Sequence, residues 1–258
     1  GRATTALESF GERVRVVNMW FDEFLTSDTA EYDRILFDLG VSMFHFQDPE
    51  VGMSIRGSGP LDMRLDRSSE APTAADLIAS LPEKELADII YQFGEERYSR
   101  RIAKALVNER TRRDIDRTED LAEIVRRAVP PAARKGRSHP ATRTFQALRI
   151  AVNRELERIT RALPAAMARL KPGGRLGVIS FHSLEDRIVK HQFRDVAKGM
   201  TRPSKSGQME PMVDTEASSF RVLTKKPVVP SPEEVAVNSP SRSAKLRVIE
   251  RLRQGGAA

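Results

Sequence analysis

The sequence predicts an α/β fold in which a helical segment interrupts a sheet-forming core. Short apolar runs typical of buried strands occur on both sides of the chain's middle, at residues 34–38 and 176–181. Between them, residues 73–140 contain a succession of amphipathic helices without a comparable strand pattern. Strands that alternate with helices favour a layered α/β domain, so residues 1–72 and 141–258 are predicted to form the core. One irregular α+β domain is the alternative.

The first part of the core is predicted to end in a strand that carries an acid. Residues 34–37 are mostly apolar, and Asp38 and Gly40 follow them. A buried parallel strand has this continuous apolar character, and it would place the carboxylate at its carboxyl end. Upstream, residues 2–10 predict the end of a helix, residues 14–17 a short strand, and residues 21–25 a turn of helix.

Proline, threonine and serine mark the ends of the predicted helices. Thr73 can cap one helix, with Asp76 completing a capping box. A helix that begins near Thr118 is stopped by Pro130 and Pro131, and a long helix is expected over residues 140–163.

The strand–helix alternation then returns. Residues 176–181 predict a buried strand, and Ser183 is expected to cap a helix that runs to about residue 198. Residues 199–219 are polar and predict a loop. The remaining predicted elements are strands at 220–224 and 246–252, with a short helix opened by Ser231 between them.

Composition narrows the class of protein. The 258 residues are 40% hydrophobic, which is enough for a substantial core, and no apolar run is as long as a membrane span. Because the chain has no cysteine, disulfides, thiolate zinc sites and cysteine nucleophiles are excluded. We therefore predict a soluble cytoplasmic protein.

The net charge of +7 is unevenly distributed. Residues 1–93 hold 8 Lys and Arg against 17 Asp and Glu, whereas residues 94–258 hold 35 against 19. Such an asymmetry indicates a polyanionic partner for the basic part, although arginine-rich helices are equally often only solvated faces.

Two predicted strand ends carry polar side chains that could form a site. Ligands of open parallel sheets bind beyond the carboxyl ends of the strands. Asp38 stands at one such end and His182 just past another, but a capping role for Asp38 and a buried structural role for His182 remain alternatives. The four histidines show no metal-ligand spacing, and there is neither a P-loop nor a G-x-S-x-G elbow. These residues alone indicate an α/β enzyme with a basic helical module.

Several stretches, in order along the chain, resemble the bacterial methyltransferase family that modifies the N4 amine of a cytidine in small-subunit (16S) ribosomal RNA. The basic stretch around residues 135–149 and the histidine-serine stretch are the most specific of them. The matching stretches are Phe37–Ser42, Gly59–Arg64, Gly94–Ala103, Lys135–Arg149, Pro172–Leu176, Ile179–Arg187 and Ser241–Arg247.

The resemblance implies a class I (Rossmann-like) methyltransferase sheet with an inserted all-helical RNA-recognition domain. It implies S-adenosyl-L-methionine as cofactor, with Phe21 near its adenine end and Asp38 and His45 lining its site; His45 stands where the family usually has glutamine. The N4 proton would be accepted by Asp38 or by a backbone carbonyl near Ser42. The RNA-binding residues would be Arg134, Lys135, Arg137, His139, Arg143, His182 and Arg187.

The beginning of the chain departs from the family pattern. The family opens with a strand, a glycine-glycine-histidine loop and a second strand, and Gly1 is expected to follow these, which makes the predicted sheet N-terminally incomplete. A catalytically inactive RNA-binding fragment is therefore an alternative, and a small-molecule methyltransferase is another. The expected partner is small-subunit ribosomal RNA or the ribosomal subunit. No membrane association is expected, and the protein could form a homodimer.

Overall fold

The chain folds into two compact units in the computed structural model, which describes residues 2–135, 138–211 and 218–253. A sheet unit comprises residues 1–39 and 157–258, and a helical unit comprises residues 40–156. The sequence range of the helical unit extends beyond the predicted 73–140 at both ends, because residues from Val51 onward and up to Val152 share its hydrophobic core.

The sheet unit is built on a mixed four-stranded sheet with the order β1-β2-β6-β5. β1 and β2 are parallel, whereas β6 is antiparallel to both of its neighbours. All four strands were predicted from the sequence, and their bounds are Tyr32–Asp38 (β1), Leu170–Ser180 (β2), Phe220–Val222 (β5) and Lys245–Arg251 (β6). The α/β fold class is thereby confirmed.

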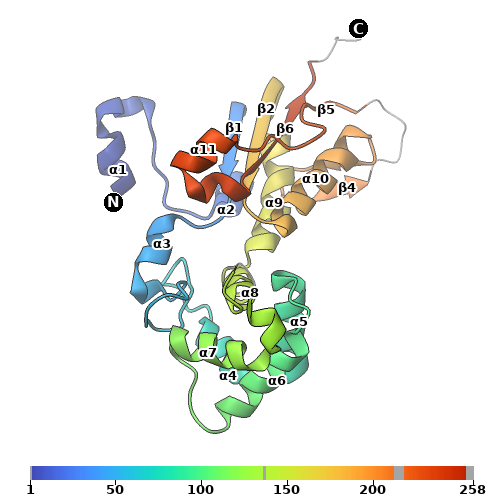
Figure 1. Ribbon diagram of the computed structural model, residues 1–258. Helices are drawn as coiled ribbons and strands as arrows, with labels where there is room; N and C mark the ends of the chain where they lie inside the picture. The colour runs from blue at the N-terminus through green and yellow to red at the C-terminus, as the bar shows by residue number, and fades with distance from the viewer. Residues whose placement is uncertain (1, 136–137, 212–217, 254–258) are drawn as a thin grey trace. The chain divides into compact units, whose positions relative to one another are not determined.

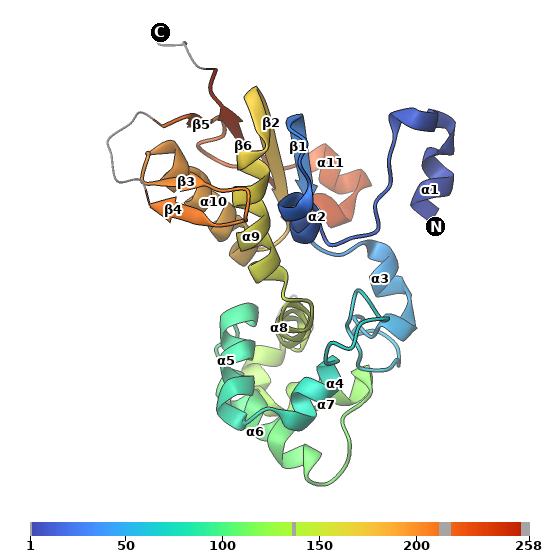
Figure 2. The same ribbon diagram turned by 180° about the vertical axis from the view of Figure 1, so that it is seen from behind.

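Helices cover both faces of this sheet. α9 (Glu155–Ala168) and α10 (Ser183–Ala197) lie on one face, and α11 (Pro232–Val237) lies on the other, as Figures 1 and 2 show from opposite sides. α10 buries Val189, Phe193 and Val196 against the sheet, because these residues recur at helical spacing. Ser231 accepts a hydrogen bond from the Glu234 N–H and caps α11, as predicted.

α2 (Phe21–Ser27) is tied to α9 by a buried carboxylate. Asp22 is only 2% exposed, and its Oδ1 accepts a hydrogen bond from Nη1 of Arg158 at 2.7 Å. Nη1 of Arg161 lies 3.5 Å from Oδ2 of the same carboxylate. The Arg158 guanidinium also stacks over the Trp20 ring, 3.8 Å from its centroid. These contacts fix the position of α2, and with it Phe21.

The predicted strand at residues 14–17 is wrong. After α1 (Arg2–Leu7) and a 3-10 helix (η1, Glu8–Arg13), these residues are extended but belong to no sheet, and Val16 and Val17 are exposed. A strand is defined by the ladder that it makes with a neighbour, and no segment in the described part of the chain pairs with residues 14–17.

The long helix expected over residues 140–163 is two helices. α8 (Thr142–Asn153) ends at Arg154, whose φ of 52° lies in the left-handed region, and α9 begins at Glu155. The guanidinium of Arg149 bonds both oxygens of Glu155 across the break, at 2.8 and 2.9 Å. Neither glycine nor proline marks this position, so local sequence gives no sign of the break.

Part of the predicted loop at residues 199–219 is a β-hairpin. β3 (Thr201–Pro203) pairs with β4 (Met209–Pro211), and the turn uses Gly207 at a φ of 83°. The prediction missed this hairpin because its strands are only three residues long and carry no alternating apolar pattern.

The helical unit packs its helices around one apolar core. Figures 1 and 2 show these helices gathered together. Thr73 and Asp76 form the predicted capping box at the start of α4. Thr118 is the first residue of α7 and not its cap. The elements are α3 (Met43–Gln47), η2 (Pro49–Val51), α4 (Ala74–Ser80), α5 (Glu83–Gly94), α6 (Ser99–Arg110), α7 (Thr118–Ala128), η3 (Pro131–Lys135) and α8.

No helix in the described ranges combines the length and the apolar character that crossing a lipid bilayer would require.

Gly94 allows α5 and α8 to touch, and we expect Gly94→Ala to destabilise the protein. A Cβ at this position would lie 2.5 Å from the backbone oxygen of Arg143, which cannot move without shifting α8. Overpacking of this kind costs about 1–3 kcal/mol, which outweighs the roughly 1 kcal/mol that alanine gains over glycine in a helix. Urea denaturation followed by circular dichroism measures the change. Gln92→Ala, an exposed change on the same helix, is the control; equal stability of the two variants would contradict the close contact.

Candidate active site

The carboxyl ends of the parallel strands β1 and β2 meet at one edge of the sheet. Asp38 is the register partner of Ile179, and the next N–H, that of Leu39, donates to the Ile179 carbonyl at 2.9 Å. Gly40 follows with a φ of 92°, a conformation that favours glycine. The Asp38 carboxylate is exposed, and no hydrogen bond or ion pair involves it within the described part of the chain. This edge therefore presents a free acceptor where open sheets bind ligands.

Phe21 lies beside the same strand end. Its ring meets that of Phe37 edge-on, with 5.5 Å between the ring centroids and an interplanar angle of 65°. Phe37 directly precedes Asp38, and neighbouring strand residues point to opposite faces. Phe21 thus covers the Phe37 face of the strand end, while Asp38 points to the other face.

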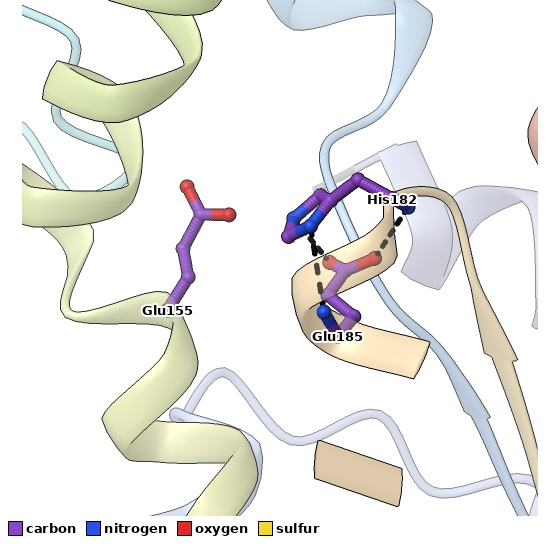
Figure 3. Close-up of side chains that lie close together, drawn as sticks. All are labelled: Glu155, His182 and Glu185. Carbon is purple, nitrogen blue, oxygen red and sulfur yellow. Dashed lines mark hydrogen bonds and ion pairs between the residues drawn. The ribbon is translucent and has the colours of Figure 1, made fainter. Parts of the chain in front are cut away.

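His182 and Glu185 form a capping box at the start of α10, as Figure 3 shows. Nδ1 of His182 accepts from the Glu185 N–H at 3.4 Å, and Nε2 lies 3.2 Å from Oε1 of Glu185. The Glu185 carboxylate accepts the N–H groups of Phe181 and His182 at 2.8 and 3.2 Å. The cap is therefore His182 and not the expected Ser183, because the imidazole can accept a hydrogen bond as well as pair with the acid.

Glu185 stays ionised in spite of its burial. It is 1% exposed, and this desolvation pushes its pKa upward. The hydrogen bond and charge of His182, together with the two backbone N–H groups, outweigh the desolvation and hold the pKa of Glu185 below its usual value. Nδ1 of His182 is thus occupied by the helix that it caps. Nε2 of His182 and Oε1 of Glu185 are buried and have no hydrogen-bond partner among the described residues, although they lie 3.2 Å apart.

A second acid–base pair joins α10 to β6. Asp186 accepts from Nε of Arg247 at 2.6 Å and from Nη2 at 3.2 Å, and Nζ of Lys245 lies 3.6 Å away. Arg247 is 7% exposed. Partial burial acts to raise the pKa of Asp186, but the hydrogen bonds and charge of Arg247 outweigh it and hold this pKa below the usual range. Sequence reasoning assigned no role to Glu185, Asp186 or Arg247; the capping spacing could have indicated Glu185, but nothing local indicates a partner 61 residues away.

Ser42 and His45 belong to the helical unit. The Ser42 hydroxyl caps α3 by accepting the Phe44 N–H at 3.3 Å, and its carbonyl accepts the His45 N–H at 2.9 Å. His45 is half-buried, and its Nδ1 has no hydrogen-bond partner among the described residues.

The expected RNA-binding residues of the helical unit are partly used by the fold itself. Arg134 donates to the carbonyls of Val129 and Arg127 at the end of α7, at 3.1 and 3.2 Å. His139 accepts the Ala141 N–H through Nδ1 at 3.2 Å, and Arg143 donates to the Glu95 carbonyl at 3.1 Å.

Two further members of the predicted RNA-binding set are exposed, and a third lies outside the residues that the structure describes. Lys135 and Arg187 are exposed, the latter on α10 of the sheet unit. Arg137 lies outside the described residues. The sheet unit thus brings Phe21, Asp38 and His182 to one end of β1 and β2. It stays a prediction that these residues and the basic residues of the helical unit serve one site.

Comparison with known proteins assigns the family. The model of the MraW methylase family matches residues 1–252. The chain belongs to this family. A relative from Treponema denticola is 47% identical over 97% of this chain and 79% of its own length. One from Azorhizobium caulinodans is 48% identical over 95% of this chain and 70% of its own length. A third, from Heliobacterium mobile, is 44% identical over 97% of this chain and 80% of its own length.

All three relatives bear the name "Ribosomal RNA small subunit methyltransferase H". Membership of the MraW methylase family confirms the resemblance seen in the sequence and identifies the chain as a methyltransferase. The mixed α/β sheet is the architecture expected of such an enzyme.

Proposed function

We propose that the protein transfers a methyl group from S-adenosyl-L-methionine to the N4 amine of a cytidine in small-subunit ribosomal RNA. The family match and the names of the relatives support the reaction class and the RNA. The observation that carries the chemistry is the unpaired carboxylate of Asp38 at the carboxyl end of β1.

The residues expected at the cofactor site have the chemistry to hold this methyl donor. Phe21 offers an aromatic ring, Asp38 a free acceptor, and His45 a ring nitrogen without a partner in the described ranges. An aromatic ring suits the adenine, and acceptors suit the hydroxyl and ammonium groups of the donor. When bound, S-adenosylmethionine supplies an electrophilic methyl group on its sulfonium. We assign the holding of the donor to these residues.

Asp38 is the better of the two candidates for the acceptor of the N4 proton. The N4 lone pair is delocalised into the ring, so an acceptor on N4–H makes the nitrogen more nucleophilic and takes its proton. Both the hydroxyl and the carbonyl of Ser42 already accept hydrogen bonds within α3, whereas the Asp38 carboxylate accepts none within the described chain. Alignment of N4 with the methyl group in a site without water then supplies the remainder of the rate enhancement.

The basic side chains would hold the RNA. Lys135 is exposed, and within the described residues Arg143 commits one side-chain donor, to the Glu95 carbonyl, so its other donors can serve phosphates. The remaining members of the proposed set are Arg134, Arg137, His139, His182 and Arg187. Because its nitrogens face Glu185, His182 would border the base through its ring face. The target cytidine must be unstacked or single-stranded to reach such a site.

Transfer of label from tritiated S-adenosylmethionine to small-subunit ribosomal RNA tests the proposal. We expect label in the RNA, either naked or in small subunits, and none in large-subunit RNA. Calorimetric titration with S-adenosylmethionine accompanies the assay, because an RNA-binding fragment without activity would bind RNA and give no heat with the donor. Label that appears only in small molecules would contradict the RNA substrate.

A further inference from the structure

The helical unit has a pocket that is lined by arginines and an exposed tyrosine. It lies between the second half of α5 and the start of α6. Part of its lining belongs to the Gly94–Ala103 stretch, which the proposed function has not used. The volume of the pocket is about 390 Å³, within the size range of ligand pockets. The lining includes Asp88, Tyr91, Arg97, Tyr98, Arg100 and Arg101.

The positive charge of this pocket is not compensated. Arg97, Arg100 and Arg101 are exposed, and no ion pair involves them in the part of the chain that the structure describes. The acid in the lining, Asp88, is bonded to Nζ of Lys84 at 2.8 Å. Other exposed arginines of the same unit have an ion-pair partner: Arg126 and Arg127 share Glu123, at 2.7 and 2.6 Å. Three unpaired guanidinium groups around one hollow favour an anionic ligand.

Tyr91 adds a stacking surface to this charge. The residue is 61% exposed, so its ring is open to a ligand. No hydrogen bond involves its hydroxyl within the described ranges. Exposed aromatic rings beside arginines are the pattern by which proteins bind single-stranded nucleic acid, where the ring stacks on a base and the cations pair with phosphates.

The turn between α5 and α6, which presents these side chains, is fixed in its conformation by contacts within the helical unit. Gly94 packs against the backbone of Arg143, and Glu95 takes a left-handed conformation with a φ of 49°. The buried Glu96 carboxylate accepts the Tyr98 N–H at 2.9 Å. The Arg97 guanidinium stacks on the Tyr98 ring, 4.7 Å from its centroid. A fixed turn reduces the entropy lost when a ligand binds, as expected of a binding site.

We propose that this pocket binds one unpaired nucleotide of the RNA substrate at a position other than the target cytidine. Tyr91 stacks on the base, and Arg97, Arg100 and Arg101 pair with the adjoining phosphates. The inference rests on the proposed function, because it takes the RNA to be the substrate, and it adds a second point of recognition that contributes to the choice of site.

The experiment measures the affinity of the full chain for a labelled small-subunit ribosomal RNA fragment over a salt series. We expect Tyr91→Ala to weaken binding about tenfold and Tyr91→Phe to leave it unchanged, because phenylalanine keeps the stacking face. Changing Arg97, Arg100 and Arg101 to glutamine should reduce the slope of log affinity against log salt by about 2, at roughly 0.7 for each phosphate that is no longer neutralised. Arg126→Gln with Arg127→Gln is the matched control and should leave the slope unchanged. Thermal melts confirm that the exposed substitutions keep the fold.

Three results would overturn the inference. If the wild-type chain binds no RNA, the proposed function fails together with the pocket. If the wild-type chain binds but the pocket variants match it in affinity and slope, the pocket inference alone is wrong. If the variants lose binding to assembled small subunits and not to naked RNA, the occupant is a protein segment and not a nucleotide.

Discussion

Replacement of Asp22 by alanine is expected to lower the free energy of unfolding of the sheet unit by about 3–5 kcal/mol. The carboxylate is 2% exposed, and Arg158, which bonds it at 2.7 Å, has a side chain that is only 18% exposed. Loss of the acid leaves a mostly buried guanidinium without its main counter-charge, and removal of one partner of a buried pair costs more than the pair contributes. α2, and Phe21 with it, would lose its buried anchor on α9 and keep the more exposed contacts of Glu23 with Arg158 and of Thr26 with Arg161.

Fluorescence of Trp20 during urea denaturation measures this change directly. Trp20 is the single tryptophan of the chain, and its ring lies under Arg158, so its signal reports unfolding of this unit even if the two units unfold separately. Asp33→Ala is the control, because Asp33 pairs with Lys171 at 3.0 Å but is 73% exposed. Because water screens an exposed ion pair, the pair contributes little to stability, and the free energy of unfolding is expected to change little. If the two variants lose the same stability, the Asp22 cluster is not the anchor described.

Replacement of Asp38 by asparagine is expected to reduce methyl transfer by about 100-fold or more, the usual contribution of a general base. The amide keeps the size of the carboxylate and loses its charge, so it cannot take the N4 proton. If Asp38 acts on the base, the reduction falls on kcat at saturating methyl donor. If it serves only to hold the donor, KM for S-adenosylmethionine rises and kcat is kept.

A matched control exists on the same strand. Asp33→Asn makes the same chemical change at the amino end of β1, where the side chain pairs with Lys171. It should leave methyl transfer unchanged. Activity of Asp38→Asn within about threefold of the wild-type value would be far below the effect of a lost general base and would exclude Asp38 from that role.

The sequence was informative where local pattern decides structure. The strand that ends at Asp38, the capping box at Thr73 and the serine cap at Ser231 all stand as predicted. The expected burial of that strand was wrong, because β1 lies at the end of the sheet order and Leu36 is 65% exposed. The sequence was less informative where structure depends on a distant partner. Residues 14–17 have strand-like composition but no strand to pair with in the described chain, and the break at Arg154 has no local cause.

The same distinction holds for the candidate site. Asp38 was predictable because a strand ends there. The contact between His182 and Glu185 has the spacing of a capping box and was open to prediction. The engagement of Arg134 and Arg143 with backbone carbonyls was not predictable, since these hydrogen-bond partners depend on the fold. The ion pairs Asp22–Arg158 and Asp186–Arg247 span 136 and 61 residues, beyond any local pattern.

The position of the methyl group on the RNA tests the central claim most directly. Small-subunit ribosomal RNA incubated with the protein and S-adenosylmethionine would be digested to nucleosides and analysed by mass spectrometry against synthetic standards. The account predicts one new product, cytidine methylated on N4, whose amount is lost with Asp38→Asn and kept with Asp33→Asn. A methyl group on carbon 5 of cytidine or on a ribose would contradict it, because an acceptor for an amine proton has no role in those products. A methyl group on an amine of adenine or guanine would contradict the choice of cytidine.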